Sequence, residues 1–230
     1  MNDSNNISLP EVVPVMSLSN TALFPQAVIP LYIFEERYRT MLSDALSTHR
    51  MIGIADIESD FESITNDPNK IASVGIIRAC KKNSDGTSHL ILQGLARIYI
   101  KQLFFDQPYA QAKILEAKSL KKETSSDYLN IKPTLLESIQ NLLQLNHQLP
   151  EDILPFLANI DDPETILDIA IASICPSGSE KQILLETLDL EERYNVFQNF
   201  LIKEKEQIQI NKKLLGCLLY TSPSPRDWLQ

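Results

Sequence analysis

The sequence of 230 residues is poor in the residues that build covalent or metal-bound frameworks. Its three cysteines, Cys80, Cys175 and Cys217, have no close spacing, which argues against a disulfide scaffold and a cysteine-type zinc site. None of its six glycines is followed by lysine, so the phosphate-binding loop of nucleotide hydrolases is absent. The motifs Gly-x-Ser-x-Gly and His-Glu-x-x-His are absent too. We therefore expect no catalytic residues, no metal site and no cofactor.

Long apolar runs are also missing. No stretch approaches the roughly 18 uninterrupted apolar residues that a membrane-spanning helix needs. Residues 1–6 have neither the basic flank nor the apolar run of a secretory signal. We therefore expect a cytoplasmic protein with no membrane partner. Apolar residues make up 43% of the chain, which is too much for disorder along its whole length.

Basic residues are scarce in the second half of the chain. The whole sequence has 21 lysines and arginines against 30 acidic residues, a net charge of −9. Residues 1–118 hold 11 basic and 13 acidic residues (−2), and residues 119–216 hold 9 and 16 (−7). The electrostatic field of this acidic second half does not attract a polyanion, so we expect no nucleic-acid partner.

The first half of the chain has the short apolar runs of β-strands. Asp85-Gly86 predicts a tight hairpin between two of these runs. Gly94 predicts a bulge or bend in the second of them, and Pro30, which cannot donate to a ladder, predicts a sheet edge or a bulge. Apolar spacing of three and four predicts one helix over residues 35–46. The expected strands are 12–16, 28–34, 51–57, 72–82, 88–104 and 109–117, which form a curved or closed antiparallel sheet.

The second half changes to a helical period. Asp162 followed by Pro163 and Glu164 is a strong helix start, and that helix should end before Pro176. Ser177 and Glu180 can form a capping box for the next helix. Helices are also expected over 131–145 and 151–158, and in a last helix whose apolar stripe is Leu190, Tyr194, Phe197, Leu201 and Ile208.

The predicted fold class is therefore α+β, with a β-rich lobe followed by a helical bundle. We place a disordered N-terminus at 1–9, the β-rich lobe at 10–118, a linker at 119–130, the helical lobe at 131–216 and a foreign tail at 217–230.

Two groups of residues could carry chemistry. Cys80 and His89 could face each other across the hairpin as a partial metal site or an activated thiol. Two ligands do not hold zinc, so we favour ordinary strand residues. The acidic pairs Glu35-Glu36 and Asp161-Asp162 fit helix starts better than acid–base catalysis, because adjacent helical residues point apart.

Several segments resemble the N-terminal substrate-recognition domain of Lon proteases. Leu23-Phe24-Pro25 followed by Ile29-Pro30-Leu31 is similar to the family's opening Phe-Pro and Ile-Pro-Leu pattern. The run from Asp85-Gly86-Thr87 to Gly94-Leu95-Ala96-Arg97 resembles its central hairpin, with Gln93 where the family often has Glu. Asp161-Asp162-Pro163 and residues 181–193 match its helices. The resemblance covers about residues 10 to 215.

This resemblance implies a PUA-like β-lobe and a helical bundle that capture unfolded or degron-bearing proteins in protein quality control. In the full protease, separate ATPase and Ser-Lys peptidase domains do the work, so this chain is expected to be non-catalytic. A protease or a chaperone is expected as a further partner. Residues 33–39 look more like the stand-alone Lon-domain proteins of bacteria. Two alternatives stay open: a truncated N-terminal fragment of an ATP-dependent Lon protease, and a PUA-like RNA-binding module.

An unfolded polypeptide offers apolar side chains, which an apolar groove with aromatic residues can bind. The aromatic residues Phe24, Tyr32, Phe34 and Tyr38 are close in sequence around two prolines. We take them as candidate substrate-binding residues. The alternative for each is a place in the core.

The end of the sequence departs from the helical pattern. Residues 217–227, Cys-Leu-Leu-Tyr-Thr-Ser-Pro-Ser-Pro-Arg-Asp, resemble one reading frame of the transposase adaptor used in DNA library preparation. A natural Ser-Pro-rich tail is the alternative.

We predict that re-sequencing the gene from its source will replace these codons, because the match runs through eleven residues. The measurement is the genomic sequence downstream of the Gly216 codon. Recovery of the same codons there would refute the adaptor origin.

Overall fold

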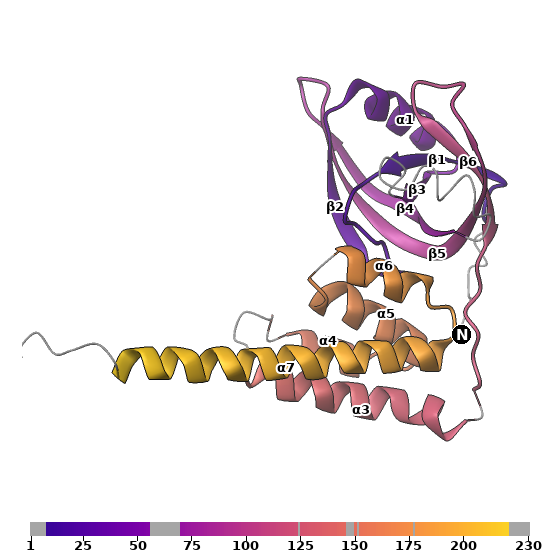
Figure 1. The fold of residues 1–230 in the computed structure, drawn as a ribbon. Helices are drawn as coiled ribbons and strands as arrows, with labels where there is room; N and C mark the ends of the chain where they lie inside the picture. The colour runs from indigo at the N-terminus through magenta and orange to yellow at the C-terminus, as the bar shows by residue number, and fades with distance from the viewer. Residues whose placement is uncertain are drawn as a thin grey trace, which may run out of the picture.

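The computed structural model describes residues 8–55, 70–123, 125–145, 150, 152–176 and 178–220. The start of the chain at 1–7, His147, the capping residue Ser177 and the tail from 221 onward lie outside the described residues. Within the described ranges a six-stranded β-lobe sits on a helical lobe (Figure 1). The predicted α+β class, with strands first and helices second, is confirmed.

The β-lobe is a closed barrel with one extra strand. Its strand order is β2-β5-β4-β3-β1-β6, and an additional pairing between β5 and β6 closes the ring. The first half of β5 pairs with β2 and its second half with β6, so one long strand serves both. The strands are β1 Val12–Ser17, β2 Val28–Ile33, β3 Met51–Ala55, β4 Ile71–Lys82, β5 Ser88–Phe104 and β6 Ala110–Glu116.

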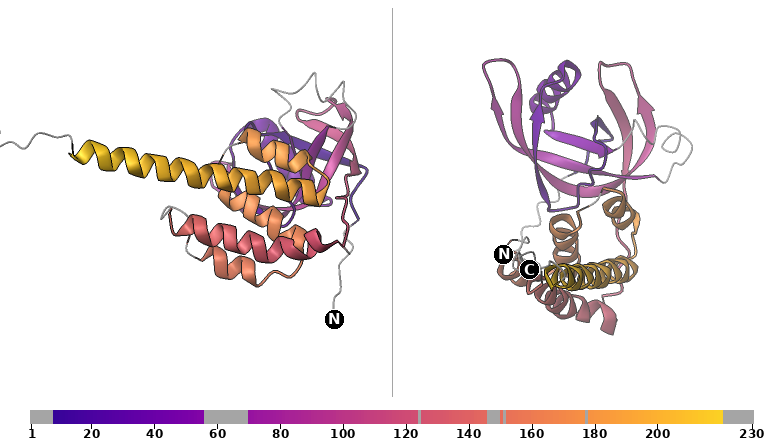
Figure 2. Two further views of the ribbon diagram at one scale, coloured as in Figure 1. Left: turned by 60° about the horizontal axis from the view of Figure 1, so that its bottom comes forward. Right: turned by 60° about the vertical axis from the view of Figure 1, so that its left-hand side comes forward.

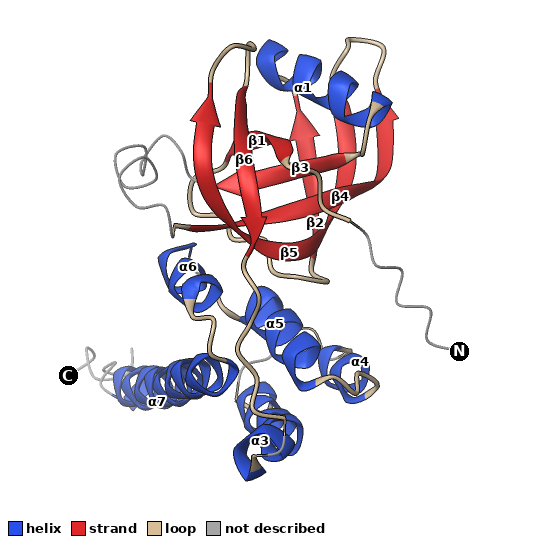
Figure 3. Cartoon of the chain, turned by 90° about the vertical axis from the view of Figure 1, so that its right-hand side faces the viewer, coloured by secondary structure: helices blue, strands red, loops and turns tan. Residues whose placement is uncertain are grey.

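The sheet is mixed rather than antiparallel throughout. β1 and β3 run parallel, with Val15 opposite Gly53. Parallel neighbours need a long crossover, and residues 18–50, which contain β2 and helix α1 (Glu36–Ser47), supply it. Helix α1 lies across one end of the barrel (Figure 3) and packs Met41 and Leu42 against its interior. Apolar alternation does not report strand direction, which is why the expectation of a purely antiparallel sheet was wrong.

Gly94 marks an irregularity in β5, as predicted. Gly75 pairs with Gly94 whereas Val74 pairs with Ala96, so Leu95 is the extra residue of a bulge. A Cβ atom at Gly94 would lie 2.1 Å from the backbone oxygen of Phe24. Glycine is therefore required here, because the chain entering β2 crosses β5 at this point.

The helical lobe confirms the predicted helices with one correction. The linker was expected to end at residue 130, but α3 begins at Ser126. The Ser125 side chain accepts a hydrogen bond from the Tyr128 amide and so caps the helix. The polar residues of this first turn concealed its helical character. The helices are α3 Ser126–Leu143, α4 Ile153–Ala158, α5 Pro163–Ile174, α6 Gly178–Glu186 and α7 Leu190–Tyr220.

The last helix, α7, extends beyond the rest of the lobe (Figure 2). Leu190, Phe197 and Leu201 are buried, and Tyr194 and Ile208 pack against the same cluster, which confirms the predicted stripe. The helical backbone continues four residues past Gly216 to Tyr220.

The two lobes share one apolar cluster. Phe24, Ala22 and Ala27 from the chain before β2, and Ile71 from β4, belong to the cluster that contains the buried residues of α3, α5 and α7. The fully buried ring of Phe24 therefore packs in the helical lobe's core although it lies in the β-half of the sequence.

A buried ion cluster reinforces this junction. Both carboxylate oxygens of Asp168 in α5 accept hydrogen bonds from Arg97 in β5, each at 2.7 Å. Arg193 in α7 donates to the same carboxylate at 2.7 Å. Arg97 also donates to the Leu185 backbone oxygen, and Arg193 donates to Ser119 Oγ. One carboxylate thus connects the barrel with two helices.

Asp168→Asn is expected to lower the free energy of unfolding by about 3–5 kcal/mol, because it leaves two buried guanidinium groups without their carboxylate. Urea denaturation followed by circular dichroism measures the change. The control is Lys132→Gln, which removes an exposed ion pair with Asp161 and should have a much smaller effect. Equal effects of the two substitutions would contradict a structural role for the cluster.

The stability of the protein is expected to fall as the pH drops below about 4.5, the usual pKa of a glutamate side chain. Burial raises the pKa of Glu164, but hydrogen bonds from Lys121 and Ser119 and the charge of Arg193 outweigh burial and lower it. A lowered folded-state pKa means that the unfolded chain takes up the proton first, so acid favours unfolding. Melting temperatures measured across pH 3–6 should show a shallower fall for Glu164→Gln, and an equally steep fall would contradict this role.

Candidate functional site

The structure separates the four candidate aromatic residues into two pairs. Phe24 is 0% exposed and Tyr38 is 8% exposed, and both belong to apolar clusters. Tyr32 is 48% exposed and Phe34 is 60% exposed. The core alternative therefore describes Phe24 and Tyr38, whereas Tyr32 and Phe34 are accessible to a ligand.

Tyr32 and Phe34 are part of a larger apolar surface on β2 and β5. In β2, alternate side chains point outward, and the register places Tyr32 opposite His89 and Pro30 opposite Ile91. The Tyr32 ring lies 5.9 Å from the Phe34 ring in a stacked arrangement and 4.7 Å from the His89 ring. We call this surface the β2–β5 face; it consists of Val28, Pro30, Tyr32, Phe34, His89, Ile91 and Gln93.

Val28, His89 and Ile91 of this face were not among the candidate residues predicted from the sequence. Period-two alternation in residues 28–34 would have grouped Val28 with Tyr32, but finding His89 and Ile91 also needs the register between β2 and β5. No local pattern sets this register, because the two strands are separated by α1, β3 and β4.

The proposed pairing of Cys80 with His89 was wrong by one residue. Cys80 lies opposite Leu90, and Lys81 lies opposite His89. The pairing of Lys82 with Ser88 leaves a five-residue loop, 83–87, and this loop sets the register that places Cys80 opposite Leu90. A shift of one residue turns a side chain to the other face of a sheet, so His89 faces outward beside Tyr32.

The free edge of β2 offers few hydrogen-bond donors. β2 is at the end of the strand order, and among the strands that the structure describes it pairs only with β5. Gly94 N donates to the Ala27 oxygen, and antiparallel ladder bonds alternate, so Val28, Pro30 and Tyr32 turn their backbone groups away from β5. Pro30 has no N–H to donate. The outward face of β2 is therefore better suited to binding than its edge.

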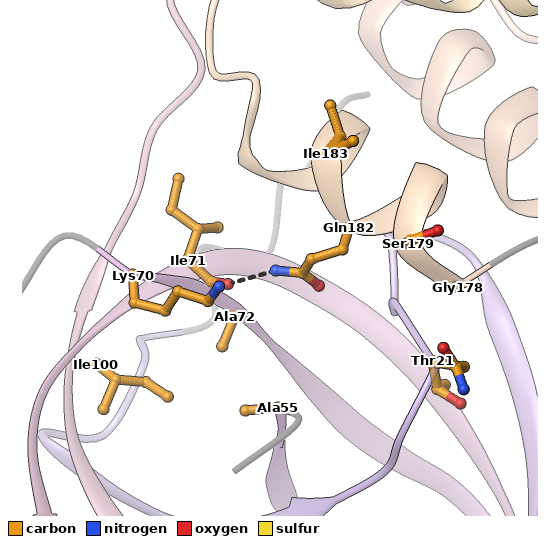
Figure 4. A pocket seen from close by; sticks show the side chains of 11 residues that line it. Thr21, Ala55, Lys70, Ile71, Ala72, Ile100, Gly178, Ser179, Gln182 and Ile183 are labelled. Carbon is orange, nitrogen blue, oxygen red and sulfur yellow. Dashed lines mark hydrogen bonds between the residues drawn. The ribbon is translucent and has the colours of Figure 1, made fainter. Parts of the chain in front are cut away.

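A cavity of about 300 Å³ lies where α6 meets the barrel (Figure 4). Among its lining residues, Gln182 of α6 donates to the Ile71 backbone oxygen, and Lys70 forms an ion pair with Glu186. These polar groups join α6 to β4, so we assign the cavity to the seam between the lobes.

The described residues contain no cluster of three or more histidine, cysteine, aspartate or glutamate side chains that could hold a metal ion. Among the same residues, no helix has both the length and the apolar character needed to cross a membrane.

A comparison with protein families identifies the chain. It matches the family model described as the ATP-dependent protease La (LON) substrate-binding domain over residues 12–203. The chain belongs to the Lon substrate-binding domain family. The matched family is thus described as the substrate-binding domain of an ATP-dependent protease.

Relatives of the Lon substrate-binding domain include complete Lon proteases. Lon protease of Dictyoglomus thermophilum is 32% identical over 207 residues, which cover 90% of this chain and 26% of that protein. Lon protease of Desulfosudis oleivorans is 29% identical over 212 residues, with shares of 90% and 26%. The chain thus spans about a quarter of the length of these relatives.

A solved structure supports the fold of the Lon substrate-binding domain. The N-terminal domain of Mycobacterium avium complex Lon protease aligns with a TM-score of 0.66 over 85% of this chain and 98% of that one. At 18% sequence identity, this likeness supports the architecture alone.

The ion cluster joins two of the segments that resemble the Lon domain. Arg97 lies in the hairpin segment and Arg193 in the helical segment, 96 residues apart in sequence. Both arginines bind Asp168. Arg97 is thus an internal ion-pair partner rather than a surface residue.

Proposed function

We propose that this Lon substrate-binding domain captures unfolded or degron-bearing polypeptides on the β2–β5 face, without cutting them itself. The observation that carries the proposal is the exposure of Val28, Tyr32, Phe34 and Ile91 side by side on one face of the barrel. Membership of the Lon substrate-binding domain family supports the binding role, and these exposed apolar side chains support the β2–β5 face as its location.

The chemistry of the face suits an unfolded chain. Contiguous exposed apolar surface is uncommon on a folded protein unless it binds something. Large aromatic side chains contribute most of the binding energy at such surfaces, and Tyr32 also has a hydroxyl that can bond to a peptide backbone. An unfolded polypeptide presents apolar side chains and backbone groups together, which this combination can bind.

In this proposal the protein acts in the cytoplasm and transfers its client to a protease or chaperone. The expectation of a stand-alone bacterial protein belongs to the same proposal. Its support is the similarity of residues 33–39 to stand-alone Lon-domain proteins.

Tyr32→Ala and Phe34→Ala together are expected to weaken binding of a fluorescein-labelled, Leu- and Phe-rich unfolded peptide by about tenfold or more, because they remove the two exposed rings. Fluorescence anisotropy measures Kd, and circular dichroism checks that the fold is intact. Phe24→Ala is not a suitable test, since emptying a core site costs about 3–5 kcal/mol.

The matched control is Phe156→Ala, which removes an equally exposed ring from α4 in the other lobe. It should leave Kd unchanged. An unchanged Kd in the Tyr32/Phe34 double variant, or an equal loss in the control, would refute the β2–β5 face as the binding site.

A second candidate function is that of the substrate-binding part of a complete ATP-dependent Lon protease. The observation that favours it is that the relatives described above are Lon proteases, of which the chain spans about a quarter. The gene sequence beyond the Gly216 codon discriminates between the candidates, because an ATPase motif there would identify a protease.

A further inference from the structure

We propose that the β2–β5 face selects apolar segments that carry acidic residues, and this inference rests on the proposed function. The partner is a polypeptide segment whose apolar side chains cover Tyr32, Phe34 and Ile91 while its carboxylates reach Arg78 and Lys81 of the neighbouring strand β4.

The strand register places both basic residues on the same face as the aromatic rings. Lys81 lies opposite His89, and His89 lies opposite Tyr32, so these three side chains form one row across three strands. Directly opposed residues of a sheet point to the same side. Lys81 is therefore about two strand spacings, or ~10 Å, from Tyr32.

Arg78 lies in the same strand as Lys81, three residues before it. It occupies the irregularity between Ile77 and Ala79, where the extra residue of β4 has no partner on β5. Its Nε donates to Gln93 Oε1 at 2.6 Å, and Gln93 Nε2 donates to Gln26 Oε1 at 2.9 Å. Gln93 pairs with Val28, so the guanidinium is held against the apolar surface by a chain of two hydrogen bonds.

The acidic side chains closest to the face in sequence have neighbours of their own. Glu35 forms a 2.8 Å ion pair with Arg37. Asp85 accepts hydrogen bonds from the hydroxyl and the backbone amide of Thr87, which lower its pKa. Within the described residues, the β2–β5 face together with Arg78 and Lys81 of β4 thus has two cations and no carboxylate, on a chain whose net charge is −9.

Because Arg78 and Lys81 make this face locally positive, it should prefer acidic segments to basic ones. A segment with basic residues would be attracted to the acidic helical lobe and repelled from Arg78 and Lys81. A segment with acidic residues would be repelled by the molecule as a whole and attracted to this face. An exposed ion pair changes affinity by up to about fivefold, and salt weakens the effect.

The test compares three fluorescein-labelled peptides that share an apolar core of Leu and Phe and are flanked on both sides by Asp, Asn or Lys pairs. At low salt the Asp-flanked peptide is expected to bind about fivefold more tightly than the Asn-flanked one, and the Lys-flanked peptide most weakly. About 0.5 M salt should remove most of the difference.

The variant Arg78→Gln/Lys81→Gln should reduce the affinity of the Asp-flanked peptide to that of the Asn-flanked one. The control Lys205→Gln/Lys212→Gln makes the same change in net charge at exposed positions of α7 and should keep the preference. Equal affinity for all three peptides, or equal effects of the two variants, would overturn the selectivity and leave the proposed function standing.

Failure of all three peptides to bind would instead refute the proposed function. A further arm replaces the peptides with a labelled oligouridylate, because aromatic rings beside cations also suit single-stranded RNA. RNA binding tighter than peptide binding and lost in the Arg78/Lys81 variant would assign the face to nucleic acid and overturn the inference.

Discussion

The Asp168 carboxylate is the point on which the arrangement of the two lobes depends. It binds Arg97 from the barrel and Arg193 from α7 in a site closed to solvent. A buried ion without its partner costs several kcal/mol, whereas a fully paired one is roughly neutral. The barrel therefore cannot bury Arg97 favourably without Asp168 of the helical lobe. The cluster makes the burial of Arg97 depend on the helical lobe and fixes the orientation in which the barrel presents the β2–β5 face.

The apolar packing around the ion cluster also joins the two lobes. Phe24 leaves the β-half to fill the core of the helical lobe, and the Arg97 guanidinium lies 5.4 Å from the centre of its ring. The segment that follows Phe24 crosses β5 at Gly94 and continues directly into β2. The junction between the lobes and the exposed face are thus built from one continuous stretch of chain. A change in the junction would be transmitted to the start of β2 through the backbone.

Local patterns predicted the elements well but not their partners. The cap at Asp162 and the stripe from Leu190 to Ile208 needed only neighbouring residues, and both are present. The parallel pairing of β1 with β3 and the start of α3 at Ser126 were missed, because the first depends on distant chain and the second on a polar turn. For the same reason, Tyr32 could not be separated from Phe24 in advance. Which side of a strand or loop meets the second lobe is decided by tertiary packing.

Pro30 has a consequence for the tendency of the β2 edge to aggregate. Residues 28–33, Val-Ile-Pro-Leu-Tyr-Ile, are an uncharged, β-prone stretch on an open sheet edge. Without proline, such six-residue segments are the typical seeds of amyloid, since each added strand offers a fresh edge to the next. The proline interrupts the row of donors and leaves the outward side chains in place. The outward apolar side chains of β2 can thus stay exposed while the edge of the strand is a poor template for a further strand.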